Sequence, residues 1–225
     1  AAFELGRVDA SVATFVGVQN GLAMGAIGEC GSAEQRAKWL PPMARGEIIG
    51  SFGLTEPLSG SDSARGLRTT AERKGDTWVL NGEKRWIGNA TWGDITVIWA
   101  KDTADGKVKG FIVPNDSPGF SAAKIENKVS LRIVQNGHIT MTNVEVPESN
   151  RLAEAHSFAD TARVLRNTRM EVAWEGVGVG AGAYEAALAY AKEREQFGQP
   201  IASHQLVQDL LVKSLSNITA SLALC

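Results

Sequence analysis

The 225-residue sequence is poor in the residues that build metal centres and disulfide frameworks. It has two cysteines, Cys30 and Cys225, and three histidines, and none of them shows the spacing of metal ligands. We therefore predict no metal site and two free thiols in a reducing compartment. The sequence also lacks an excess of positive charge, with 23 Lys and Arg against 25 Asp and Glu, so we predict neither nucleic acid nor an anionic membrane as a partner.

Long hydrophobic runs are missing as well. The most apolar stretches, around 12–28 and 172–190, are interrupted by Gln19, Asn20 and Glu185, so neither reaches the roughly 18 apolar residues of a membrane span. The first residues do not form a signal peptide, and we expect a cytoplasmic protein. Both ends fall within helical patterns, so we expect the sequence to be the central part of a longer chain.

The patterns that are present divide the sequence into three parts. Residues 1–47 have apolar positions at three- and four-residue steps, and Ser32 and Gln35 form a capping box for a helix that ends near Ala44. Residues 151–225 are again helical, with one helix from about Ser157 to Arg194 and a second after Ser203. We expect these two to form half of a helical bundle.

Residues 48–150 differ from both helical parts in residue composition and in the spacing of their apolar residues. Short runs rich in Val, Ile, Thr and Trp alternate with hairpin signals, which are Lys74-Gly-Asp76, Asn81-Gly82, Asp105-Gly106 and Asn136-Gly137. We predict a compact antiparallel barrel or sandwich here. The fold class is therefore α+β, with N-terminal helices, a central β domain and a C-terminal helical segment.

One polar stretch follows the first predicted strand directly. It reads Phe52-Gly-Leu-Thr-Glu-Pro-Leu-Ser-Gly-Ser-Asp62, an apolar lead-in followed by residues that favour a tight turn with free backbone N–H groups. Such a turn forms a concavity suited to phosphate oxygens. The alternative is an ordinary surface turn, for which Ser, Gly, Pro and Asp are the usual residues.

The sequence of residues 52–62 resembles the flavin-binding signature of the acyl-CoA dehydrogenases and acyl-CoA oxidases. The resemblance, which is nearest to the glutaryl-CoA dehydrogenase and plant short-chain oxidase branch, implies an FAD-dependent enzyme that converts an acyl-CoA to a trans-2-enoyl-CoA in fatty acid β-oxidation. It implies a homotetramer built as a dimer of dimers, and electron-transfer flavoprotein as the acceptor of a dehydrogenase. The location it implies in a eukaryote is the peroxisome or the mitochondrial matrix.

The same resemblance assigns the cofactor and substrate contacts. Ser61 and Arg169 are expected to contact the CoA substrate, although Arg169 is equally typical of a helix salt bridge. The expected FAD contacts within one chain are Phe52, Leu54, Thr55, Gly60, Ser61, Trp86, Ile87 and Gly88.

Trp86-Ile-Gly-Asn89 matches the family's Trp-Ile-Thr-Asn segment, whose Trp stacks beside the flavin. Gly88 replaces the threonine that faces the redox-active flavin nitrogen, as it does in plant short-chain oxidases, so dehydrogenase and oxidase both remain open. The alternative for Trp86 is a residue that covers a sheet face.

Arg194-Glu-Gln-Phe-Gly198 and Gln205 resemble the segment that reaches the FAD of a neighbouring subunit. By this resemblance Arg194, Phe197 and Gln205 complete the cofactor site of a second copy, and an arginine suits phosphate because it donates two parallel hydrogen bonds. The alternative is a solvated helix end followed by a turn. The glycines of Gly176-x-Gly-x-Gly-x-Gly182 lie within a helical pattern and favour close helix packing over dinucleotide binding.

The catalytic base is expected outside the sequence. One branch of the family carries its glutamate directly before the arginine matched by Arg169, and this position is Thr168. Glu171 does not match, so we expect a base glutamate C-terminal of Cys225. Glutaryl-CoA dehydrogenases hold a distal carboxylate with an Arg-Ser pair, but the matching positions are Ala13 and Thr14, which favours a neutral acyl chain.

Three rival interpretations remain. The first is an acyl-CoA oxidase that passes electrons to oxygen. The second is a truncated chain that keeps the fold without turnover. The third is a helical adaptor with an embedded β module, which explains the helix and strand pattern but not the specific sequence of residues 52–62.

Overall fold

The computed structural model describes residues 1–225, which form two compact units. One unit consists of residues 15–168, and the other of residues 1–14 together with 169–225. The expected domain boundaries after residues 47 and 150 stay a prediction.

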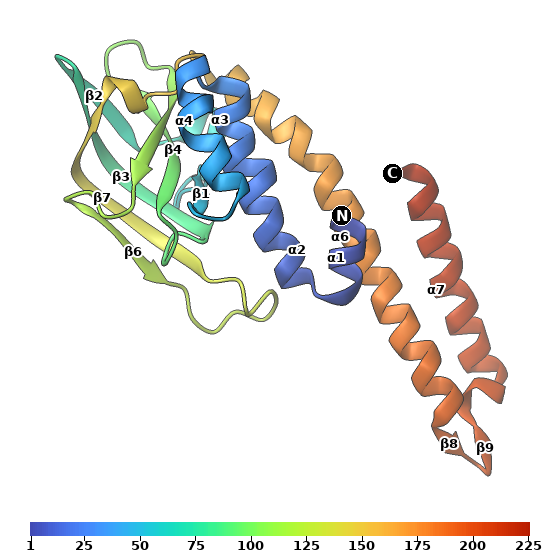
Figure 1. Ribbon diagram of the computed structural model, residues 1–225. Helices are drawn as coiled ribbons and strands as arrows, with labels where there is room; N and C mark the ends of the chain where they lie inside the picture. Colours follow the sequence, from blue (N-terminus) through green and yellow to red (C-terminus); the bar gives the residue numbers. More distant parts are fainter. The chain divides into compact units, whose positions relative to one another are not determined.

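A curled seven-stranded sheet dominates the unit 15–168 (Figure 1). The strand order is β1-β4-β2-β3-β7-β6, and β5 pairs with the second edge of β4. Most strand pairs are antiparallel, but β1 and β2 both run parallel to β4. The residue pattern of 48–150 predicted an antiparallel domain and did not predict these two parallel pairs. The strands are β1 Gly50–Gly53, β2 Thr70–Lys74, β3 Thr77–Gly88, β4 Ile95–Asp102, β5 Val108–Pro114, β6 Phe120–Lys124 and β7 Asn136–Pro147.

Two of the predicted hairpin turns are wrong. Asn81-Gly82 lies inside β3, opposite a bulge of β7: between the pairs Leu80–Val144 and Gly82–Met141, β3 has one residue and β7 has two. Asn136-Gly137 begins β7 and pairs with the end of β3. The turns at Gly75-Asp76 and Asp105-Gly106 are found as predicted, between β2 and β3 and between β4 and β5.

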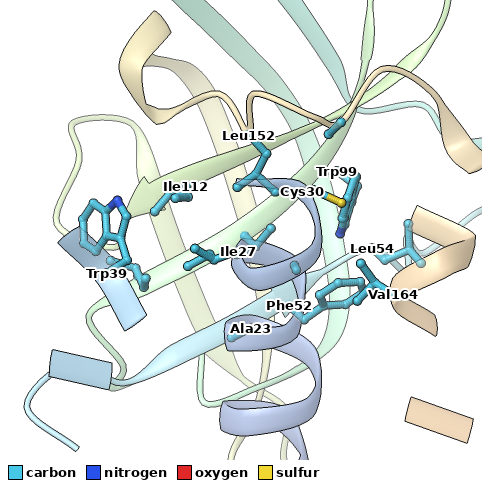
Figure 2. Packing of buried hydrophobic residues seen from close by; sticks show 14 of the residues in the cluster. Ala23, Ile27, Cys30, Trp39, Phe52, Leu54, Trp99, Ile112, Leu152 and Val164 are labelled. Atoms are coloured by element: carbon cyan, nitrogen blue, oxygen red, sulfur yellow. The ribbon is translucent and has the colours of Figure 1, made fainter. Parts of the chain in front are cut away.

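Helices cover the sheet next to β1 and β4. The segment before β1 contains α2 (Ala10–Val16), the π-helix η1 (Gly17–Met24), α3 (Gly25–Cys30) and α4 (Ala33–Ala44), whose predicted capping box is present. Side chains from α3 and α4 pack on both strands around Phe52 and Trp99, as Figure 2 shows. A second core fills the opposite face of the sheet, so β4 is buried on both faces.

One helical stretch, Ala10–Cys30, is long and apolar enough to cross a membrane by length and composition alone. Its Gln19 is buried and donates to the carbonyl oxygens of Met43 and Ile48 at 3.0 and 2.9 Å, while its side-chain oxygen accepts from Gly50 N at 2.6 Å. Ala23 and Ile27 belong to the core around Trp99. These contacts are typical of a core helix.

The other unit is a set of packed helices. It contains α1 (Ala2–Val8), most of α6 (Phe158–Glu193) and α7 (Gln205–Leu224), and Figure 1 shows α6 and α7 antiparallel. They are joined by the hairpin of β8 (Glu195–Gln196) and β9 (Gln199–Pro200) and by the short helix η3 (Ile201–Ser203). Two short helices, α5 (Ser63–Gly66) and η2 (Glu148–Asn150), belong instead to the unit 15–168. The long helix predicted from about Ser157 to Arg194 is present. The helical pattern at the start of residues 1–47 is interrupted at Asp9, whose backbone is extended.

Candidate functional site

The polar stretch after β1 forms a tight loop, as predicted. Glu56 and Ser59 pair through their backbones, with N–H to oxygen distances of 3.1 and 3.3 Å, so Pro57 and Leu58 turn the chain. Ser59 Oγ then donates to the carbonyl oxygen of Asp62 at 2.9 Å, directly before α5. Residues 55–62, which we call the cradle, are thus shaped by their own hydrogen bonds.

Gly60 and Ser61 are exposed, as are Pro57, Leu58 and Asp62 of the cradle. The N–H groups of Gly60 and Ser61 donate to no backbone carbonyl of the chain. A Cβ atom added to Gly60 meets nothing within 4 Å, and the backbone there has no left-handed φ. The fold itself therefore gives no reason for a glycine at position 60, whereas the close approach of a ligand to the backbone does. This open space with two free donors fits a phosphate group.

The end of β3 lies directly beside the cradle. Arg85 N donates to the carbonyl oxygen of Thr55 at 2.8 Å, and Asn89 Nδ2 donates to that of Gly50 at 3.2 Å. Trp86 follows Arg85 with a φ of 66° and keeps 52% of its surface exposed. A positive φ is rare for a bulky residue and is found preferentially at functional sites.

The exposed indole of Trp86 has a defined setting. The Arg85 guanidinium carbon lies 5.4 Å from its ring centroid, and Asn136 Nδ2 donates to the Trp86 carbonyl oxygen at 3.0 Å. A hollow of about 430 Å³ adjoins the indole, and its wall is mainly apolar. The lining residues are Trp86, Asn127, Lys128, Val129, Ser130, Leu131 and Asn136.

Three of the predicted FAD contacts have buried side chains. Phe52 and Leu54 belong to the core around Trp99 (Figure 2), and Ile87 belongs to the core on the other face of the sheet. Their side chains are therefore not available to a ligand. Gly88 is also buried, and a Cβ atom there would lie 3.2 Å from Val18 Cγ2.

The residues predicted for a neighbouring subunit gather around one hairpin of the helical unit. Ile201 N donates to the Arg194 carbonyl oxygen at 2.7 Å, and Phe197 lies at the hairpin tip, 94% exposed, with a φ of 56°. Gln205 begins α7 just beyond this hairpin. The chain thus presents Arg194, Phe197 and Gln205 on one projecting end, while Arg169 is exposed earlier on α6.

The pKa of Glu171 is raised, as is usual for a partly buried carboxyl. Burial raises its pKa, and the neighbouring charge of Glu175 raises it further. Glu175 accepts a 2.6 Å hydrogen bond from Thr14 Oγ1.

Sequence reasoning missed a buried ion pair at the base of the cradle. Lys84 is fully buried and its Nζ lies 2.8 Å from Glu56 Oε1. Inward-facing positions of a strand alternate, which is the signal that would reveal a buried lysine. Trp78, Leu80 and Lys84 do alternate in this way along β3, but the hairpin turn expected at Asn81-Gly82 divides the strand and hides the pattern.

Three family models match the chain in succession. They are the N-terminal domain of acyl-CoA dehydrogenases over residues 1–47, the middle domain over 51–144 and the C-terminal domain over 158–225. The chain belongs to the acyl-CoA dehydrogenase family. The family is one of FAD-dependent oxidoreductases. The family and the α+β fold class predicted from the sequence are confirmed.

Individual relatives agree with this membership. A crystal structure of glutaryl-CoA dehydrogenase from Mycobacterium smegmatis is 42% identical, with a TM-score of 0.95 over 99% of this chain and 57% of that one. Another, of such an enzyme from the same organism in complex with FADH2, is 38% identical with a TM-score of 0.94, over 99% of this chain and 57% of that one. The mouse mitochondrial short-chain specific acyl-CoA dehydrogenase is 34% identical over 91% of this chain and 50% of its own length. The chain thus spans about half the length of these acyl-CoA dehydrogenases.

Proposed function

We propose that the protein binds FAD and dehydrogenates an acyl-CoA thioester between its α and β carbons, giving a trans-2-enoyl-CoA. The observation that carries the proposal is the hydrogen bond between Arg85 N and the Thr55 carbonyl oxygen, because it joins the cradle to the Trp86 segment. A site that receives a dinucleotide with a flat ring needs phosphate donors and an aromatic wall close together. Both are present in the unit 15–168.

The residues of the cradle suit the cofactor. Gly60 and Ser61 offer free N–H groups to phosphate oxygens, Thr55 offers a hydroxyl to a ring edge, and Trp86 offers its indole as a wall. Gly88 offers a backbone N–H where the family has a threonine. FAD supplies the hydride-accepting centre that no side chain can provide. The chain's own residues then bind the cofactor, orient it and exclude water.

Two parts of the active site are proposed to lie outside residues 1–225 of the same copy: one comes from a second copy of the chain and the other from a residue C-terminal of Cys225. Arg194, Phe197 and Gln205 reach the FAD of a second copy in a homotetramer, which explains a fully exposed phenylalanine at a hairpin tip. The base that removes the α proton is a glutamate C-terminal of Cys225. The family alternative for it is the position of Thr168, which cannot act as a carboxylate base.

The substrate is proposed to be an acyl-CoA with a neutral acyl chain, contacted by Ser61 and Arg169. Thr14, at a position where glutaryl-CoA dehydrogenases bind a distal carboxylate, donates to the carboxylate of Glu175. The carboxylate of a substrate tail would there lie close to a negative charge without a cation to pair with, which is costly.

The second candidate is an acyl-CoA oxidase, and Gly88 favours it because the threonine hydroxyl is missing. Electron-transfer flavoprotein is the acceptor proposed for the dehydrogenase, and oxygen for the oxidase. We place the protein in fatty acid β-oxidation. We propose a cytoplasmic location, or the peroxisome or mitochondrial matrix in a eukaryote.

The test is anaerobic reduction of the flavoprotein by butyryl-CoA, followed by mixing with air. Loss of the flavin absorption near 450 nm on adding butyryl-CoA is the expected result for both candidates. A reduced flavin that persists in air supports the dehydrogenase, and prompt peroxide release supports the oxidase. A purified protein without flavin, or a flavin that butyryl-CoA does not bleach, would contradict both.

A further inference from the structure

The cradle belongs to a longer excursion between β1 and β2, and both ends of this excursion meet at one carboxylate. Glu56 leaves the sheet just after β1, and its Oε2 and Oε1 accept from Arg68 N at 2.7 Å and from Thr69 N at 2.9 Å, just before β2. The side chain of Glu56 is 4% exposed. Residues 57–67, including Gly60 and Ser61, therefore form a loop that a single side chain closes at its base.

Lys84 on β3 holds this carboxylate from below. Its Nζ donates to Glu56 Oε1 at 2.8 Å, to the Leu54 carbonyl oxygen at 3.2 Å and to the Trp99 carbonyl oxygen at 2.7 Å. An ammonium group has three N–H donors, so all of them are satisfied. The next residue, Arg85, holds the Thr55 carbonyl oxygen through its backbone. The exit from β1 is thus fixed by two consecutive residues of β3.

A buried ion pair is a costly way to gain stability. Removing both charges from water costs about as much as their attraction returns, and well-packed apolar side chains do equally well. What an ion pair adds is a fixed direction for each hydrogen bond, because each oxygen has its own partner. Here those directions set where the loop 57–67 starts and ends.

We propose that Lys84 and Glu56 are positioning residues, which hold the loop 57–67 in the conformation that presents the Gly60 and Ser61 N–H groups to a pyrophosphate. The inference rests on the proposed binding of FAD. Neither residue touches the ligand, since both side chains are buried beneath the loop. They act through the two loop ends and through the carbonyl oxygens of Leu54 and Thr55.

The chain offers a matched control in the same unit. Lys109 forms a largely buried ion pair with Asp102, and its other contacts are with Asp105 and the Trp78 ring, all outside residues 54–69. A Lys109→Met variant therefore removes a comparable pair without touching either end of the loop.

The experiment compares wild-type protein, Lys84→Met and Lys109→Met at a temperature well below all three melting temperatures. The two readouts are the dissociation constant for FAD, after removal of bound flavin, and amide hydrogen exchange of residues 57–67 without FAD. We expect Lys84→Met to weaken FAD binding by at least about tenfold and to lose protection in the loop, whereas Lys109→Met keeps both even if it melts at an equally low temperature.

The outcomes separate this inference from the proposed function. Wild-type-like FAD binding and loop protection in Lys84→Met would overturn the inference and leave the cofactor assignment intact, as would equal losses in both variants. If the wild type itself binds no FAD, the proposed function fails. Selective loss of loop protection in Lys84→Met would then still support the positioning role, and unchanged protection would overturn it.

Discussion

At the scale of single residues, two buried charges govern the region at the base of the cradle. Burial lowers the pKa of Lys84 to about 8, although the Glu56 charge works in the opposite direction. Burial raises the pKa of Glu56, but the Lys84 charge and the hydrogen bonds to Lys84 and Thr69 outweigh it, so the net direction is downward. At neutral pH the pair is therefore charged on both sides.

The pair predicts how the Lys84→Met variant responds to pH. A carboxyl with a lowered folded pKa stabilises the fold above its ordinary value of 4.5 and loses that contribution as the pH falls through the folded pKa. Without the cation, burial is opposed only by the hydrogen bonds from residues 68 and 69, so the pKa of Glu56 rises above its value in the wild type and the variant is penalised where Glu56 is ionised. We expect a loss of about 3 to 5 kcal/mol at pH 7 and a smaller loss at pH 4.

Urea unfolding at the two pH values measures this difference. A loss of the same size at pH 4 and pH 7 would show that the charge of Glu56 is not the cause. The Lys109→Met variant shows how much of the change belongs to any removed lysine.

Gly88 gives a second prediction at this scale. A Cβ atom there lies 3.2 Å from Val18 Cγ2, closer than ordinary contact. We expect Gly88→Ala to lower the free energy of unfolding by about 1 kcal/mol through overpacking. Val18→Ala should make the additional Gly88→Ala change nearly neutral, and thermal unfolding of the four proteins completes the double-mutant cycle. Equal costs of Gly88→Ala with and without Val18 would refute the contact.

At the scale of elements, two glycines determine how α6 packs in the helical unit. A Cβ atom at Gly178 would lie 2.1 Å from the Phe3 carbonyl oxygen, and one at Gly182 would lie 2.0 Å from that of Arg7. Backbone atoms cannot move aside as a side chain does. The small residues therefore allow close approach of α1 and α6, the interpretation that the sequence favoured over a dinucleotide motif.

Alanine substitutions test this packing against helix propensity. We expect Gly178→Ala to destabilise the protein by about 1 to 3 kcal/mol through overpacking. Gly176 is the matched control, because a Cβ atom there meets nothing within 4 Å. Gly176→Ala should stabilise the helix by up to about 1 kcal/mol, as expected for alanine in a helix interior. Chemical denaturation that ranks the two variants in the reverse order would contradict the close approach.

What could be predicted at this scale depended on how local the signal was. The capping box of Ser32 and Gln35 was predictable because both partners lie within one helical turn. The continuation of β3 through Asn81-Gly82 was not, because Asn-Gly is typical of a hairpin turn. Its determinants are distant in sequence: Asn143 N donates to Asn81 Oδ1 at 2.8 Å, and Thr69 packs against Gly82. The buried Lys84 was hidden for the same reason.

At the scale of the whole molecule, the similarity to relatives shows the family, whereas the expected substrate preference depends on residues of this chain. The relatives include glutaryl-CoA dehydrogenases, yet Thr14 of this chain donates to Glu175 instead of standing beside a cation. We therefore expect butyryl-CoA to reduce the protein-bound flavin at least about tenfold faster than glutaryl-CoA, a difference of about 1.4 kcal/mol in barrier height. Anaerobic stopped-flow absorption measures both rates, and faster reduction by glutaryl-CoA would refute the neutral-chain assignment.

The central claim is that the cradle and the Trp86 segment bind FAD, and a calorimetric titration of the flavin-free protein with FAD tests it most directly. The variant Gly60→Val fills the open space at the cradle, where a Cβ atom meets nothing within 4 Å, and Gly176→Val is a control at a glycine where a Cβ atom likewise meets nothing. We predict that the wild type and Gly176→Val bind FAD with equal affinity and that Gly60→Val binds at least about tenfold more weakly. Equal affinity in Gly60→Val, or no binding by the wild type, would contradict the account.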